Sequence, residues 1–319
     1  MKIVFMEAKT LGEDVDLKAF EKLGDVVKYP LSDSNENASR IKDCDIIVVN
    51  KIPMNEASLK EAKNLKLICL TATGTNNVDF AYTNSRGIVV TNVKGYSTDS
   101  VVQHTFSLFF YLYEKMAYYD RFVKSGQYAV NDVFSHFTEK FNELSGKTWG
   151  IIGLGTIGRS VANIAKAFGC NVIYYSTTGV NDTEDFKRVS LEELLQNSDV
   201  VSIHCPLNAN TKNLMNRERL ELMKKNAILL NLGRGPIVNE EDLYEALEKG
   251  TIGAAGLDVL CEEPMNPNNP LLKIQDSSKL VITPHIAWAT VEARQRCADE
   301  VYENIRAFLE GKQRNVVIC

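Results

Sequence analysis

Three polar side chains follow successive β-prone runs in the second half of the chain, and together they could bind a carboxylate and transfer a proton. Arg234 follows the run 227–231, and Glu263 and His285 follow the next two runs. A guanidinium binds a carboxylate through two parallel hydrogen bonds. An imidazole exchanges a proton near neutral pH, and a neighbouring carboxylate orients it and favours its charged form. Taken singly, each residue is more simply explained as a surface charge or part of a turn.

A glycine pattern in the middle of the chain predicts where a cofactor would bind. Residues 149–159 read Trp-Gly-Ile-Ile-Gly-Leu-Gly-Thr-Ile-Gly-Arg, and a helical pattern follows them. At a strand-to-helix turn, Gly-x-Gly-x-x-Gly allows a tight bend, close approach of a pyrophosphate and close packing of the helix. The amides of Thr156 and Ile157 would face an anion at the positive end of the helix dipole. The glycines of the pattern are Gly153, Gly155 and Gly158.

These two sets of residues are expected to meet at one edge of a parallel sheet. The run 171–175 completes a strand–helix–strand unit after the glycine pattern, so dinucleotide binding is predicted there. Parallel strands place their carboxyl ends at the same edge, which would bring Arg234, Glu263 and His285 beside a nicotinamide. Hydride transfer to a keto acid needs a group that binds the substrate carboxylate, an acid that protonates the carbonyl oxygen, and such a cofactor.

The surrounding sequence predicts an α/β fold with two doubly wound parallel-sheet domains, Rossmann-like or flavodoxin-like, and a cleft between them. β-prone runs alternate with helical patterns, which favours parallel strands with right-handed crossovers. A helical pattern at 290–310 is expected to return to the first domain. We therefore predict a discontinuous substrate domain (1–98 plus 289–319) and a dinucleotide-binding Rossmann domain (99–288). The strands expected in the first domain are 3–6, 26–29, 46–49, 67–70 and 88–91.

Length and composition indicate a cytoplasmic, globular protein. The 319 residues suffice for about two domains, and 45% hydrophobic with 24% charged residues is ordinary for soluble proteins. The net charge of −5 carries no Lys/Arg block, which argues against nucleic acid as a partner. The opening run 1–5 is expected to be a strand rather than a signal peptide, and no membrane span is expected. Seven cysteines without a Cys-x-x-Cys pair predict free thiols, with neither disulfides nor a metal site.

Other segments give local predictions. The loop 71–79 follows a predicted strand, where its amides could bind an anion, although such loops are more often simple turns. The segment 99–114 is apolar almost all round, which predicts a helix buried between domains or subunits. The polar segment 120–147 is expected to be a connector. Ser190 and Glu193 are expected to form a capping box at a helix start.

Motifs spread over the chain resemble those of the D-isomer-specific 2-hydroxyacid dehydrogenases, and the resemblance runs essentially end to end. Segments 92–97 and 285–290 are similar to the glycerate dehydrogenase (hydroxypyruvate reductase) branch. The resemblance implies reversible reduction of a small 2-oxo acid, hydroxypyruvate or glyoxylate, to D-glycerate or glycolate. The motifs are Gly153-Leu154-Gly155-Thr156-Ile157-Gly158, His204-Cys205-Pro206-Leu207, Asn231-Leu232-Gly233-Arg234-Gly235, Gly256-Leu257-Asp258-Val259, Glu263-Pro264 and Pro284-His285-Ile286-Ala287.

The resemblance also implies roles for individual residues and a homodimer joined through the cofactor domains. Arg234 would bind the substrate carboxylate and carbonyl, His285 would be the acid/base, and Glu263 would pair with it. The amides of Thr73 and Gly74 would bind the carboxylate. The expected cofactor-binding residues are Gly153, Gly155, Thr156, Ile157, Gly158, Ser176, His204, Cys205, Pro206, Thr211, Asn231, Leu232, Gly233 and Asp258, the last holding the nicotinamide carboxamide.

Some positions leave specificity open. Ser176-Thr177-Thr178 stands where a Rossmann domain usually has an acid for the ribose 2′-hydroxyl. Its absence removes repulsion toward a 2′-phosphate, but the sequence shows no nearby Arg to receive one, so NAD is slightly favoured and NADP stays open. Gln103 replaces the Glu of many relatives, a change that the glycerate dehydrogenase branch tolerates. Trp288 is expected either to wall the substrate pocket or to pack between domains.

Alternatives remain within and outside this activity. A short-form 3-phosphoglycerate dehydrogenase or another D-2-hydroxyacid dehydrogenase would carry the same motifs. Formate- or phosphite-oxidising relatives are disfavoured, because the formate dehydrogenases carry Gln where Glu263 stands. A dinucleotide-sensing, corepressor-like protein would bind the cofactor and a partner protein instead; such relatives usually have disordered tails, and we expect none here.

Overall fold

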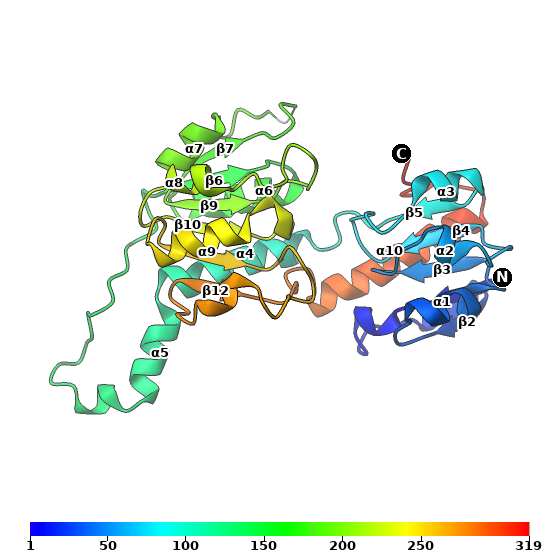
Figure 1. Cartoon of the computed structure of the whole chain (residues 1–319), viewed down its shortest axis with the longest axis horizontal. Coiled ribbons are helices and arrows are strands. Elements are labelled where there is room, and N and C mark those ends of the chain that lie inside the picture. The colour runs from blue at the N-terminus through cyan, green and yellow to red at the C-terminus, as the bar shows by residue number, and fades with distance from the viewer. Residues whose placement is uncertain (181, 319) are drawn as a thin grey trace. The chain divides into compact units, whose positions relative to one another are not determined.

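The computed structural model of this chain describes residues 1–180 and 182–318, which fall into two compact units (Figure 1). Unit 1 consists of Met1–Ser97 and the segment that begins at Ala289, and unit 2 is Thr98–Trp288. Each unit contains one parallel sheet with helices packed on it. None of the helices in the described residues is long and apolar enough to cross a membrane.

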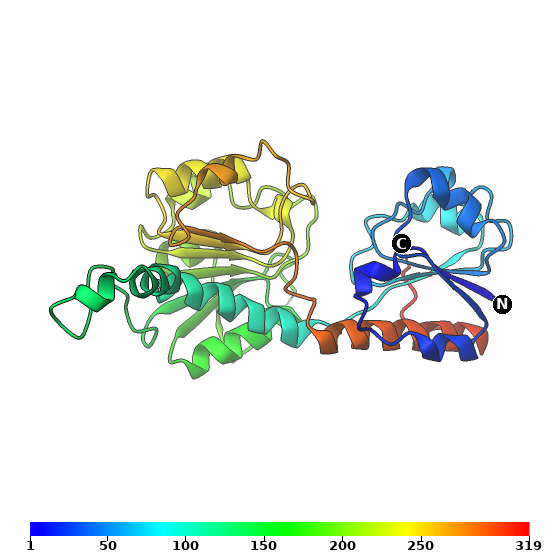
Figure 2. The same cartoon turned by 90° about the horizontal axis from the view of Figure 1, so that it is seen from below.

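Unit 1 contains a five-stranded parallel sheet in the order β2-β1-β3-β4-β5. Its inner strands β3 and β4 are continuous apolar runs, buried throughout, because both faces of the sheet are covered. In Figure 2, α10 lies along one face of the sheet and α1, α2 and α3 lie on the other. The strands are β1 (Lys2–Phe5), β2 (Asp25–Lys28), β3 (Ile46–Val49), β4 (Leu67–Leu70) and β5 (Val89–Thr91). The helices are α1 (Ser34–Ile41), α2 (Glu56–Leu59), α3 (Phe80–Ser85) and α10 (Val291–Leu309).

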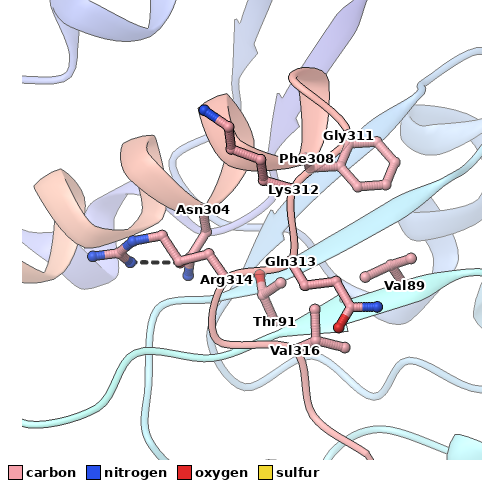
Figure 3. A pocket seen from close by; sticks show the side chains of 9 residues that line it. All are labelled: Val89, Thr91, Asn304, Phe308, Gly311, Lys312, Gln313, Arg314 and Val316. Atoms are coloured by element: carbon pink, nitrogen blue, oxygen red, sulfur yellow. Dashed lines mark hydrogen bonds between the residues drawn. The ribbon is translucent and has the colours of Figure 1, made fainter.

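The final segment of unit 1 covers the edge strand β5. Val316 pairs with Thr91 in an antiparallel bridge, and the guanidinium of Arg314 donates to Asn304 of α10 at 2.8 Å. A cavity of about 220 Å³ lies between this segment, β5 and the end of α10 (Figure 3). The bridge satisfies backbone groups that an open sheet edge would leave free.

Unit 2 contains a seven-stranded parallel sheet in the order β12-β11-β10-β9-β6-β7-β8. The chain runs outward from β6 to β8 and then crosses over to β9, so the direction of winding reverses between β6 and β9. Open α/β sheets bind ligands at such a reversal. The strands are β6 (Thr148–Ile152), β7 (Asn171–Tyr175), β8 (Lys187–Arg188), β9 (Val200–Ile203), β10 (Ile228–Asn231), β11 (Ala254–Leu257) and β12 (Leu280–Ile282). The helices are α4 (Thr98–Tyr113), α5 (Met116–Lys124), α6 (Thr156–Ala167), α7 (Leu191–Asn197), α8 (Arg217–Glu221) and α9 (Glu240–Glu248).

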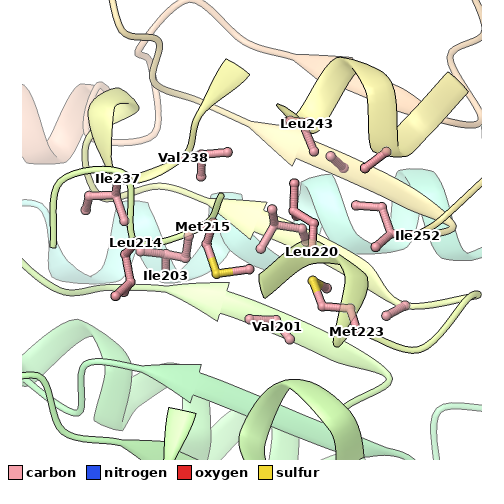
Figure 4. Close-up of a cluster of buried hydrophobic side chains, with 14 of the residues drawn as sticks. Val201, Ile203, Leu214, Met215, Leu220, Met223, Ile237, Val238, Leu243 and Ile252 are labelled. Carbon is pink, nitrogen blue, oxygen red and sulfur yellow. The ribbon is translucent and has the colours of Figure 1, made fainter. Parts of the chain in front are cut away.

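Hydrophobic clusters cover both faces of the second sheet. In Figure 4, Leu220 and Leu243 pack with Val201 on the face covered by α8 and α9. On the other face, α4 and α6 cover Trp149, which is fully buried and donates its indole N–H to Ser202 Oγ at 2.9 Å. The hydrogen bond satisfies the one polar group that the large indole brings into the core.

Two predictions about helices need correction. The helix predicted at 99–114 is present as α4, but its buried residues pack on β10, β11 and α6 of its own unit; a contact of α4 with another subunit stays a prediction. The segment 120–147 was expected to be a connector. Residues 131–147 contain neither helix nor strand and lead to β6, as expected, but the segment begins inside α5, which was not predicted. The aromatic residues of α5 stack on one another and on His136 rather than on a core, and α5 buries no residue; for example, the centroids of the Phe122 and His136 rings are 3.7 Å apart.

Two smaller features also differ from expectation. Strand β8 was not predicted, because the two-residue edge strand is charged and carries no apolar alternation. The capping box of α7 is only half formed. Ser190 Oγ accepts from the Glu193 amide at 3.0 Å, but the Glu193 carboxylate pairs with Lys187 at 2.8 Å instead of returning to the cap.

Candidate active site

The glycine turn leads from β6 directly into α6. Gly153 has a φ of +95°, and a Cβ there would lie 2.8 Å from the backbone of Cys205. A Cβ on Gly158 would lie 2.2 Å from the Gly153 carbonyl oxygen, so neither position accepts a side chain. A Cβ on Gly155, in contrast, would meet no described atom within 4 Å. The turn therefore combines tight packing with an open approach, as binding of a pyrophosphate requires.

Two buried polar groups beside this turn have no hydrogen-bond partner among the described residues. They are the Ser176 hydroxyl, just after β7, and both ring nitrogens of His204, just after β9. Strands β7 and β9 flank β6 in the sheet. Because buried polar groups are normally hydrogen-bonded, these two fit a polar ligand that lies across the carboxyl ends of the three strands. The residues present thus suit a dinucleotide.

The buried imidazole of His204 makes stability depend on pH. Desolvation lowers the pKa of this group to about 3, whereas a histidine in the unfolded chain titrates near about 6.5. The stability contribution is therefore complete above pH 6.5 or so and is lost as the pH falls toward the folded pKa. In the wild type, this group should lower the free energy of unfolding by about 1–2 kcal/mol between about pH 7 and pH 5. In His204→Gln we expect that part of the decrease to be absent, as measured by urea denaturation. A variant that keeps the wild-type pH dependence would contradict this.

His285 and Glu263 form a hydrogen-bonded pair after neighbouring strands. His285 Nδ1 lies 2.7 Å from Glu263 Oε2, and since a carboxylate can only accept, Nδ1 carries the proton. The other Glu263 oxygen accepts from the Leu260 amide at 3.0 Å, which fixes the carboxylate. No described residue bonds Nε2 of His285, whose side chain is 26% exposed. The pair therefore presents Nε2 to a ligand.

Asp258 holds the backbone segment that carries His285. Its carboxylate is buried and accepts from Thr283 Oγ1 at 2.6 Å and from the amides of Ile286 and Ala287, both at 2.9 Å. His285 has a φ of +54°, a left-handed conformation that non-glycine residues seldom adopt. The Asp258 bonds on both sides of this residue hold that conformation. The expected contact of Asp258 with the nicotinamide carboxamide stays a prediction.

His104 and Thr283 extend this network and were not assigned a role from sequence. His104 Nε2 lies 2.9 Å from Thr283 Oγ1 and 3.6 Å from Asp258 Oδ1. Burial lowers the pKa of His104, and the charge of Asp258 opposes that shift. The sequence signals were the Gln103-His104 pair, of which only Gln103 was interpreted, and the place of Thr283 directly before Pro284-His285.

Arg234 lies in the loop that follows β10. Asn231 shapes this loop, because its side chain donates to the Arg234 carbonyl at 3.0 Å and accepts from the Gly233 amide at 3.1 Å. The guanidinium donates to the Gly233 carbonyl at 2.8 Å. No described carboxylate lies within ion-pairing distance of it, so other N–H groups remain for a ligand. Since β10, β11 and β12 are neighbours, Arg234 lies at the same sheet edge as Glu263 and His285.

Other predicted residues have mainly internal contacts. The Thr211 hydroxyl is buried and donates to the Pro206 carbonyl at 2.7 Å, and Cys205 is buried against Gly153. Trp288 packs on the hydrophobic core of unit 2. Whether these residues also contact a ligand stays a prediction. In the part of the chain that the structure describes, no group of His, Cys, Asp and Glu could hold a metal ion.

The loop 71–79 in unit 1 is held by its own side chains. Thr73 Oγ1 donates to the Val93 carbonyl at 2.7 Å, and Asn77 donates to the Ile52 carbonyl at 2.9 Å. Within the described residues, the amides of Thr73 and Gly74 donate no hydrogen bond. The loop is thus fixed while two amides stay available to an anion.

The structure corrects one expectation at the cofactor site. The sequence showed no Arg near Ser176, but Arg188 on β8 donates to the carbonyl of Gly179, in the turn that Ser176 begins, at 3.1 Å. Pairing of β8 with β7 brings Arg188 there, in register with Tyr174. This contact could not be predicted while β8 itself was missed.

Comparisons with known proteins identify relatives of this chain. A family model described as D-isomer specific 2-hydroxyacid dehydrogenase, NAD binding domain, matches residues 106–287. Hydroxypyruvate reductase of Blautia hydrogenotrophica is 38% identical, with 99% of each chain covered. Glycerate dehydrogenase of Methylorubrum extorquens is 37% identical, over 99% of this chain and 98% of its own. Among solved structures, TT0316 protein from Thermus thermophilus has a TM-score of 0.89 at 32% identity, with both chains covered completely.

Proposed function

Because this chain belongs to the D-isomer specific 2-hydroxyacid dehydrogenase family, and is thus an oxidoreductase that interconverts 2-oxo and 2-hydroxy acids, we propose that its substrates are hydroxypyruvate or glyoxylate. The products would be D-glycerate or glycolate. When bound, the nicotinamide dinucleotide supplies the hydride for reduction and accepts it in oxidation. The observation that carries the proposal is the His285–Glu263 pair at the sheet edge that also holds the glycine turn.

His285 is the acid/base in this proposal. In reduction, protonated Nε2 gives its proton to the substrate carbonyl oxygen, and in oxidation neutral Nε2 takes the hydroxyl proton. Glu263 holds Nδ1–H and thereby directs Nε2 at the substrate. Arg234 binds the substrate carboxylate and stabilises the negative charge that develops on the carbonyl oxygen.

Main-chain amides complete the proposed anion sites. Those of Thr73 and Gly74 bind the substrate carboxylate, and those of Thr156 and Ile157, at the start of α6, bind the pyrophosphate. We assign Trp288 to the wall of the substrate site. The cofactor residues that we propose are Gly153, Gly155, Thr156, Ile157, Gly158, Ser176, His204, Cys205, Pro206, Thr211, Asn231, Leu232, Gly233 and Asp258.

A panel of 2-oxo acids tests the proposed substrates. We expect kcat/KM for hydroxypyruvate and glyoxylate to exceed that for phenylpyruvate by about 10-fold or more, because a tryptophan at the wall of the substrate site, the place we assign to Trp288, would leave room for a compact side chain only. Oxidation of NADH and NADPH would be followed at 340 nm for these acids, pyruvate and 3-phosphohydroxypyruvate. A preference for 3-phosphohydroxypyruvate would favour 3-phosphoglycerate dehydrogenase instead. Intact dinucleotide binding without turnover of any acid would favour a sensor.

We also propose a homodimer formed through an exposed aromatic arm, residues 116–142 of unit 2. Phe134 and Phe137 in this arm are 90% and 77% exposed, and a groove next to them is lined by Met116, Tyr119 and Phe141. An apolar surface of this kind usually marks a contact with another chain. A monomer mass for the wild type in sedimentation equilibrium at micromolar concentration would contradict the dimer.

We place the enzyme in the cytoplasm, since all six described cysteines are free thiols.

A further inference from the structure

We propose that Arg188, together with the hydroxyls of Ser176, Thr177 and Thr178, forms a 2′-phosphate site that makes this chain prefer NADP(H) to NAD(H). The inference rests on the proposed dinucleotide site at the glycine turn. It concerns the turn after β7 (Figure 1), which lies next to that site because the Gly153 amide donates to the Tyr175 carbonyl at 2.9 Å.

Hydroxyl groups replace the usual acid in this turn. An Asp or Glu at the end of the second strand normally binds the ribose 2′-hydroxyl and repels a 2′-phosphate. Here the Ser176 hydroxyl is buried and has no described partner, and Thr178 Oγ1 accepts from the Val180 amide at 3.3 Å. Hydroxyls can donate to phosphate oxygens, so the turn offers donors where most Rossmann domains offer a carboxylate.

Arg188 adds a positive charge to the same turn. Its guanidinium donates to the Gly179 carbonyl, and a Cβ on Gly179 would lie 3.6 Å from its other terminal nitrogen. The residue is exposed, and among the described residues no carboxylate lies within ion-pairing distance of it. Its neighbour Lys187 differs, because its ammonium is paired with Glu193 at 2.8 Å. Arg188 can therefore bind a phosphate without breaking an ion pair.

The acid that follows the turn does not occupy this position. Asp182 Oδ1 accepts from the Tyr174 hydroxyl at 3.1 Å and from the Thr183 amide at 3.0 Å. These bonds hold its carboxylate to Tyr174 and Thr183 instead of to Arg188. A guanidinium and a phosphate dianion form charge-assisted, bidentate hydrogen bonds, whereas the neutral 2′-hydroxyl of NAD offers Arg188 no such partner.

Binding of two mononucleotides tests the site without any turnover. Adenosine 2′,5′-bisphosphate carries the 2′-phosphate and AMP lacks it, and isothermal titration calorimetry gives the Kd of each for the full chain. We expect the bisphosphate to bind at least about 10-fold more tightly than AMP, with the difference shrinking in high salt because the interaction is ionic. Equal affinity for the two nucleotides in the wild type would overturn the inference while leaving the dinucleotide site standing. Binding of neither would overturn both.

Three variants assign the preference to individual residues. Arg188→Gln should weaken binding of the bisphosphate about 10- to 100-fold and leave AMP unchanged. Lys187→Gln is the matched control on the same strand and should keep the preference. Ser176→Asp should reverse the preference by repelling the 2′-phosphate. If Arg188→Gln weakened both nucleotides equally, the residue would only hold the turn and the inference would be wrong.

Discussion

Replacing His285 with Ala is expected to lower kcat for reduction of the 2-oxo acid by about 100- to 10,000-fold, the usual contribution of a positioned acid. The reason is geometric, since His285 Nε2 is the free end of an imidazole whose Nδ1 is held by Glu263 at 2.7 Å. Single-turnover oxidation of NADH or NADPH, followed in a stopped-flow instrument, measures the chemical step directly.

Dinucleotide binding separates this result from a general loss of structure. His285 lies after β12, outside the glycine turn, so the Kd of the reduced cofactor, measured by its fluorescence, should stay near the wild-type value. His136→Ala provides a control, because it removes a histidine that lies outside the site; it should leave kcat unchanged, and sedimentation checks that the variant keeps the wild-type oligomeric state, since His136 lies in the proposed dimer arm. Near-normal turnover in His285→Ala would show that the acid is another group and would remove the main support for the mechanism.

Replacing Arg234 with Gln is expected to lower kcat/KM for the 2-oxo acid by about 100- to 1,000-fold, the size seen when a donor to a developing oxyanion is removed. The guanidinium has one internal bond, to Gly233, and its remaining N–H groups can bind the carboxylate and the carbonyl oxygen together. Both KM and kcat should therefore change, because the substrate carboxylate is bound in the ground state and the oxygen gains charge only in the transition state.

Arg234→Lys sharpens the test. An ammonium keeps the charge but cannot make the planar two-point contact, so we expect little recovery over Arg234→Gln. Arg217→Gln is the control, because Arg217 is an exposed arginine of the same unit that pairs with Glu245 at 2.8 Å. Full activity in Arg234→Lys would mean that charge alone matters and that the bidentate clamp is wrong.

Most of the fold could be predicted from local sequence signals. The strands β3, β4 and β7 have the expected bounds, because continuous apolar runs between turn residues are read directly from the chain. Two elements were missed. The strand β8 is only Lys187-Arg188 and shows no apolar alternation, and α5 was included in a segment judged by its polar residues, since it buries no residue in a core.

The sequence by itself determined that Arg234, Glu263 and His285 lie at one sheet edge with the glycine turn. The reason is that the carboxyl ends of the strands in a parallel sheet all lie at the same edge. Tertiary structure alone decided how these groups are held. The left-handed backbone of His285 depends on the carboxylate of Asp258, more than twenty residues earlier in the chain, and Arg188 reaches the Ser176 turn only through pairing of β8 with β7. Such contacts join residues that are distant in sequence, and the free energy that selects them arises only after the strands have paired.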